Sequence, residues 1–140
     1  MKVHKEPWAT RPIVLCSGSF LYSLAVWVDC KLKSAAVAQN SYVASSKSFK
    51  DILLEASPYP PNALLFTADA ESYYTSINTQ QALREISNYL HVNEKKFKET
   101  PVKALMADLR LVITYNIFSF GDTFWLQLSG TAMGTPPVFR

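Results

Sequence analysis

The residues that most often bind zinc or form disulfides are scarce in this 140-residue sequence. Cys16 and Cys30 are the only cysteines, and neither belongs to a C-x-x-C pair or adjoins a histidine run, which excludes a zinc-finger spacing. Two buried thiols are therefore expected, and a disulfide between them is the alternative. His4 and His91 each stand alone in the sequence and are not expected to be ligands.

The sequence also lacks a hydrophobic run long enough to cross a membrane. The longest apolar stretch, Phe20 to Val28, falls short of the roughly 20 residues that a transmembrane helix needs. Met1 to Arg11 is basic, but charged residues and prolines interrupt the sequence around it, so no signal peptide is expected. No membrane partner is predicted.

Charged residues are few and apolar residues are plentiful. Only 18% of the residues are charged and 49% are hydrophobic, which is typical of a globular domain and argues against a disordered chain. The length fits one compact unit that can bury a core. A net charge of +3 suits a polyanionic partner but does not select one.

Hydrophobic periodicity and capping residues predict helices along most of the chain. Ser48 with Asp51 resembles a capping box, Thr79 is a candidate cap, and Thr100 followed by Pro101 is a third helix start. Apolar residues recur at helical spacing after each start and also after Ser19. The predicted helices cover residues 17–33, 48–56, 79–90 and 101–113.

Three segments have the composition of strands. Ala63 to Asp69 is nearly all apolar until it ends in a carboxylate, which predicts a central strand buried on both faces. Ile117–Phe120 and Thr123–Leu128 flank a Gly121-Asp122 turn, which predicts a hairpin. The expected fold class is α+β, with helices packed on one face of a small antiparallel sheet.

Two of these features have the chemistry of a site. A carboxylate at the tip of a buried strand, here Asp69, can hold a hard cation such as Mg²⁺ on a rigid backbone, although it can equally start a turn. Gly130 to Pro137 contains two glycines that would let the main chain approach a base, although such a loop is often only a turn. Arg11-Pro12-Ile13 fixes a guanidinium that could meet phosphate oxygens, a weak signal by itself.

Taken in order, these segments resemble motifs of reverse transcriptases, particularly those of the Penelope-like and related retroelement type. The family has R-P-I, then F-T-x-D-x-x-x-x-Y-T-x-I, then Q-x-x-G-T-A-M-G-x-P. Arg11 to Ile13, Phe66 to Ile77 and Gln127 to Pro136 match these motifs in the same order. The last motif is the most distinctive. The resemblance implies part of a right-hand polymerase, with residues 1–57 in the fingers and residues 58–140 in the first part of the palm.

The resemblance also implies roles for single residues. Asp69 would be the catalytic carboxylate and would bind Mg²⁺, with the carbonyl of Ala70 as a supporting ligand. Tyr74 would lie under the incoming sugar, where its ring would clash with a 2′-hydroxyl and so favour deoxynucleotides. Arg11 would touch the triphosphate, and Met133 and Gly134 would lie against the nascent base pair. The residues expected to contact the template are Gly130, Thr131, Thr135 and Pro136.

The implied function is Mg²⁺-dependent nucleotidyl transfer from deoxynucleoside triphosphates to a DNA primer on an RNA template, in the nucleus or the cytoplasm. No acid follows Asp122, and the family's Tyr-x-Asp-Asp hairpin is missing, so a truncated polymerase that is inactive by itself is expected. The alternative is a non-catalytic nucleic-acid-binding module that retains the palm fold.

Overall fold

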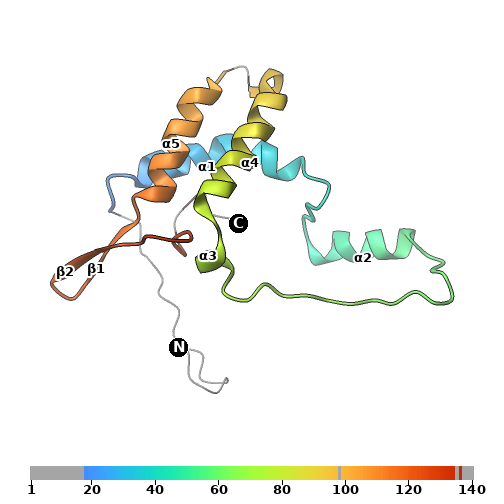
Figure 1. The fold of residues 1–140 in the computed structure, drawn as a ribbon. Coiled ribbons are helices and arrows are strands. Elements are labelled where there is room, and N and C mark those ends of the chain that lie inside the picture. Colours follow the sequence, from blue (N-terminus) through green and yellow to red (C-terminus); the bar gives the residue numbers. More distant parts are fainter. Residues whose placement is uncertain (1–17, 98, 135, 137–140) are drawn as a thin grey trace.

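A computed structural model describes residues 18–97, 99–134 and 136. Along this part of the chain, helices and one hairpin follow in the order α1, α2, α3, α4, η1, α5, β1 and β2 (Figure 1). Their bounds are α1 Tyr22–Val37, α2 Ser46–Glu55, α3 Tyr73–Ser76, α4 Thr79–Val92, the 3₁₀ turn η1 Glu94–Phe97, α5 Val102–Thr114, β1 Ile117–Phe120 and β2 Thr123–Leu126. The described fold is α+β, as the sequence predicts.

Three helices, α1, α4 and α5, provide most of the core, with α5 packed against the other two, and the 3₁₀ turn η1 adds Phe97 (Figure 1). Each contributes apolar side chains at helical spacing, and α5 contributes most because its buried positions repeat every three or four residues. The buried core side chains are Ala25, Val28, Leu90, Phe97, Val102, Leu105, Leu109, Val112 and Ile113. The core thus joins α1, from the predicted fingers segment, to helices of the predicted palm segment, and the division into segments stays a prediction.

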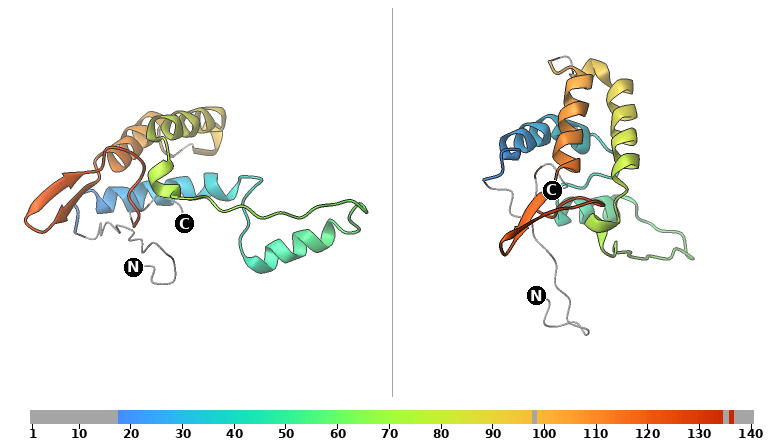
Figure 2. Two further views of the ribbon diagram at one scale, coloured as in Figure 1. Left: turned by 60° about the horizontal axis from the view of Figure 1, so that its bottom comes forward. Right: turned by 60° about the vertical axis from the view of Figure 1, so that its left-hand side comes forward.

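Helix α2 and the chain after it form an arm, defined here as residues 45–70, that extends away from the three-helix core (Figure 2). Helix α2 is amphipathic in sequence, yet none of its residues is buried. The hydroxyl of Tyr59 donates to the carbonyl of Leu53 and ties the returning chain to this helix. The arm is therefore held by few contacts.

The predicted buried strand at Ala63–Asp69 is wrong. This stretch is extended but pairs with no strand among the described residues, and its apolar side chains face solvent. Leu64, Leu65 and Phe66 are 93%, 82% and 86% exposed. A strand requires a neighbour that accepts and donates its backbone hydrogen bonds, and local composition does not reveal whether that neighbour is present.

The hairpin of β1 and β2 is confirmed, with Phe120 paired to Thr123 next to the turn, although its second strand ends at Leu126 and not at Leu128 as predicted. Gly121 adopts a left-handed backbone there (φ 59°), which a tight hairpin turn requires. All strand residues of the hairpin except the half-buried Phe118 are exposed. The expectation that helices would cover this sheet is wrong, because α5 packs against α4 and α1 instead.

The structure tests the cysteine prediction only in part. Cys30 lies in α1 as a free thiol, but it is exposed and not buried. Cys16 lies outside the described residues, so the expected burial of its thiol stays a prediction.

Candidate functional site

The segment after Asp69 ends in a tightly bonded turn. Ser72 adopts a left-handed backbone (φ 51°), which is uncommon for a residue with a side chain. Its carbonyl oxygen accepts hydrogen bonds from the Thr75 amide at 3.1 Å and the Ser76 amide at 3.0 Å, and from the Thr75 hydroxyl at 3.0 Å. These bonds close the short helix α3 and fix the position of Tyr74.

The glycine-containing loop after β2 reaches this turn from the other end of the fold. The Thr131 amide donates to the Tyr74 carbonyl at 2.8 Å, across 57 positions of sequence. The Thr79 hydroxyl donates to the Gly130 carbonyl at 3.2 Å. Thr131 and Ala132 are 2% and 1% exposed, so the loop side of the contact is buried. We call these residues, Tyr74, Thr75, Thr79, Gly130 and Thr131, the junction.

Gly130 has no room for a side chain. An ideal Cβ at this position would lie 2.5 Å from the Tyr74 carbonyl oxygen and 2.6 Å from the Thr75 Cα. Both are main-chain atoms, so neither can move aside as a flexible side chain would. The backbone is also left-handed (φ 72°), a conformation that favours glycine. Glycine is therefore required for the loop to approach the Tyr74 turn this closely.

The two tyrosines of α3 differ in exposure. Tyr74 is half-buried, whereas Tyr73 is 46% exposed. Their ring centroids are 5.5 Å apart and the ring planes meet at 78°, an edge-to-face contact that restricts both rings. Tyr74 is thus the less exposed of the two, and it is the one that the resemblance to reverse transcriptases would place beneath a sugar.

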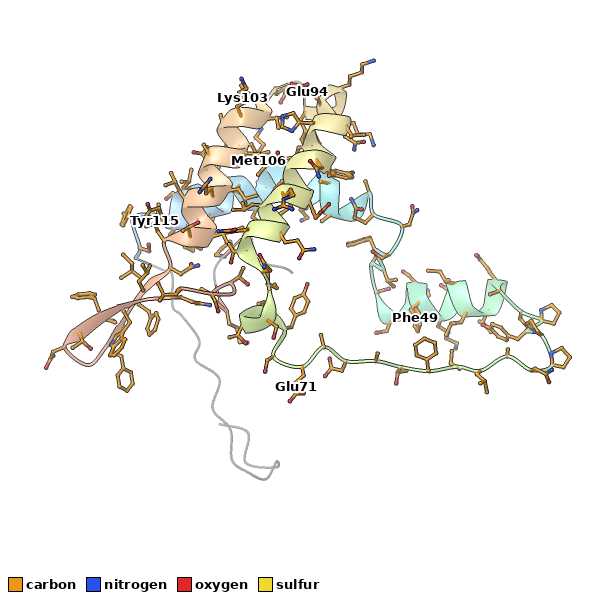
Figure 3. The ribbon with its side chains drawn as sticks, viewed as in Figure 1. Phe49, Glu71, Glu94, Lys103, Met106 and Tyr115 are labelled. Carbon is orange, nitrogen blue, oxygen red and sulfur yellow. The ribbon has the colours of Figure 1, made fainter. Side chains whose placement is uncertain are left out.

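Asp69 and Ala70 lie in the exposed extended chain just before this turn. Glu71 lies at the end of the same stretch, away from the three-helix core (Figure 3). Among the described residues, no three His, Cys, Asp or Glu side chains come together as a group that could hold a metal ion. Asp69 and the Ala70 carbonyl do not by themselves make a complete Mg²⁺ site.

The remaining predicted residues lie along the loop or outside the described chain. Met133 and Pro136 are half-buried, and Gly134 is exposed with a left-handed backbone (φ 107°). Gly130 and Thr131 are buried against α3, and their hydrogen bonds are to protein groups. Whether they also contact a template stays a prediction. Arg11 and Thr135 fall outside the described residues.

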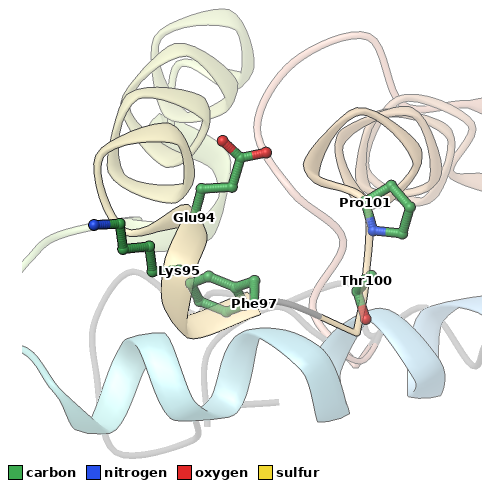
Figure 4. Close-up of a pocket in the computed structure, with 5 residues that line it drawn as sticks. All are labelled: Glu94, Lys95, Phe97, Thr100 and Pro101. Carbon is green, nitrogen blue, oxygen red and sulfur yellow. The ribbon is translucent and has the colours of Figure 1, made fainter.

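A separate shallow cavity of about 390 Å³ lies at the far end of α4, lined by Glu94, Lys95, Phe97, Thr100 and Pro101 (Figure 4). Helix α4 runs from the junction at Thr79 to Val92, so the two features are about 20 Å apart at 1.5 Å per residue. Lys95 and Lys96 are exposed here, as expected for a solvated connection. The cavity is not part of the junction.

Sequence reasoning did not identify Thr79 as part of the site. The sequence predicts that Thr79 caps α4, but the cap is Asn78, whose side-chain oxygen accepts from the Gln81 amide at 3.0 Å. Because Asn78 fills that role, the Thr79 hydroxyl is available to reach Gly130. The one sequence feature that could have indicated this role is the adjacent pair of capping residues Asn78 and Thr79, because only one of the two can cap α4.

Comparisons of the chain with family models, with curated proteins and with solved structures gave no match. Among the described residues, no helix has both the length and the apolar character to span a bilayer.

Proposed function

We propose that this chain is part of an RNA-directed DNA polymerase and that the junction forms one wall of its nucleotide site. The reaction would transfer a deoxynucleotidyl group to a primer 3′-hydroxyl on an RNA template and release pyrophosphate. Asp69 would provide one anionic oxygen ligand for Mg²⁺, and the other carboxylates of the site would come from outside the described residues.

The observation that carries this proposal is the contact between Tyr74 and Thr131. The two residues belong to the F-T-x-D and G-T-A-M-G segments, which the resemblance assigns to the same nucleotide site. Hydrophobic patterning does not require these two turns to meet, since each lies outside the three-helix core. Two segments that bind the same ligand must lie close together. This would explain why the contact between them requires a glycine at position 130.

The roles of the other residues depend on their places in the fold. The half-buried Tyr74 ring would lie under the sugar and would leave no space for a 2′-hydroxyl. Met133 and the exposed Gly134 come directly after the junction, where the main chain is free to approach a base pair. Arg11 would bind the triphosphate, and RNA and DNA would be the macromolecular partners.

Titration of the ¹⁵N-labelled chain with dATP or ATP, each with MgCl₂, tests this proposal because chemical-shift changes report even weak binding. We expect the changes at residues 69–75 and 130–134, with dATP bound roughly tenfold more tightly than ATP, the discrimination that one small group provides. Tyr74→Phe should keep this preference and Tyr74→Ala should remove it. Asp69→Asn should weaken the Mg²⁺-dependent part of binding.

Glu71→Gln is the matched control for Asp69→Asn, because Glu71 is an exposed acid two positions away with no predicted role. It should leave nucleotide binding unchanged. Shift changes confined to the Glu94–Pro101 cavity, or equal affinity for dATP and ATP, would contradict the proposal. Salt-sensitive RNA binding that survives Asp69→Asn would instead favour the non-catalytic nucleic-acid-binding module.

A further inference from the structure

Tyr74 is anchored through its main chain. Its carbonyl oxygen accepts the Thr131 amide at 2.8 Å, and the neighbouring Gly130 carbonyl accepts the Thr79 hydroxyl at 3.2 Å. These two bonds join segments that are 57 and 51 positions apart in the sequence. They therefore fix the α3 turn relative to the loop, which local bonds within the turn cannot do.

Because Gly130 has no Cβ, its main chain lies directly against the main chain of the Tyr74 turn. With the ideal Cβ only 2.5 Å from the Tyr74 carbonyl oxygen, even the smallest side chain would push the turn away from the loop. The ring of Tyr74 would move with its main chain, because its edge-to-face neighbour Tyr73 belongs to the same short helix and would move too.

We infer that Thr79, Gly130 and Thr131 are positioning residues for Tyr74 and thereby set its selectivity for the nucleotide sugar. The inference rests on the proposed function, since it assumes that a sugar lies against the Tyr74 ring. Steric rejection of one hydroxyl group depends on ring placement to within a fraction of an ångström. A turn tied by two long-range hydrogen bonds and one close main-chain contact provides that placement.

The test compares Gly130→Ala with Gly121→Ala. Both glycines have left-handed backbones, with φ values of 72° and 59°, so both substitutions introduce backbone strain. A Cβ at Gly121 would meet nothing within 4 Å, so only Gly130→Ala displaces Tyr74. Gly130→Ala should shift the ¹⁹F resonance of 3-fluorotyrosine at position 74 and lower the preference for dATP over ATP about fivefold. Gly121→Ala should change neither.

Thr79→Val provides a second, milder variant in case Gly130→Ala does not fold. It keeps the shape of the side chain and removes only the bond to the Gly130 carbonyl, and it should lower the dATP preference two- to threefold, roughly. Thr114→Val is its control, because Thr114 is an exposed threonine at the end of α5 and is not one of the junction residues.

The outcomes separate the inference from the proposed function. If the wild-type chain prefers dATP and both junction variants keep that preference, the positioning role is overturned and the proposed function stands. If the wild-type chain binds neither nucleotide, or binds both equally, the proposed function fails and the inference fails with it. A lower preference in both junction variants, with both controls unchanged, supports the inference.

Discussion

At the scale of single residues, burial decides which apolar side chains stabilise the fold. Leu109 and Leu111 are two positions apart on α5, yet Leu109 is 1% exposed and Leu111 is 42% exposed. Leu109 belongs to the buried core, whereas Leu111 faces solvent. Leucine therefore contributes to the stability of the fold at position 109 and contributes very little at position 111.

Leu109→Ala should lower the free energy of unfolding by about 2–5 kcal/mol, because it removes buried methyl groups and leaves a cavity. Leu111→Ala should change it by no more than about 0.5 kcal/mol, as expected at an exposed helix position. Urea unfolding followed by circular dichroism measures both. Equal losses in the two variants would contradict the described packing of α5.

The residues of the candidate site were predictable only in part. The Asp69, Tyr74 and Gly130 segments were identified from motif resemblance, but the hydrogen bond between Tyr74 and Thr131 was not. Such a contact depends on how distant turns meet in space, and neither periodicity nor capping residues carry that information. Thr79 was missed for the same reason, since its partner is 51 positions away.

At the scale of elements, the predictions that the structure confirms depend on interactions between residues close together in the sequence. Helices α4 and α5 and the β1–β2 hairpin begin within one residue of their predicted starts, because apolar spacing and a glycine turn act over a few residues. The caps predicted for the two helices are wrong, since Asn78 caps α4 and the N-cap of α5 is Pro101, which makes no side-chain hydrogen bond. Helix α2 begins two residues earlier than predicted, since Ser45 is its cap and accepts the Ser48 amide at 3.1 Å.

Residues 64–70 should exchange their amide hydrogens at nearly unprotected rates. Their backbone groups form no strand pairing among the described residues, and their side chains are exposed, so little shields them from water. Amides of α4 and α5 near Leu90, Leu105 and Leu109 should be protected. Hydrogen–deuterium exchange by NMR distinguishes the two groups. Strong protection at Leu64 to Thr67 would instead support the strand predicted from the sequence.

At the scale of the whole molecule, the core is small relative to the chain. The chain exposes 11541 Å², whereas a compact monomer of 15.7 kDa would expose about 7,300 Å². The arm and the hairpin contribute to this excess, because the three-helix core does not cover their aromatic and aliphatic side chains. Composition predicted a globular fold, but it could not predict which apolar segments would remain outside the core.

The junction joins the two most specific segments of the sequence, and both the function proposed for the chain and the role of Tyr74 depend on it. Proton–proton distances in solution test this contact directly. A nuclear Overhauser effect should connect the Gly130 Hα atoms to the Thr75 Hα, since an ideal Gly130 Cβ lies only 2.6 Å from the Thr75 Cα. The Thr131 amide should also exchange slowly. If no such cross-peak appears and the Thr131 amide exchanges as fast as those of residues 64–70, the two segments do not share a site.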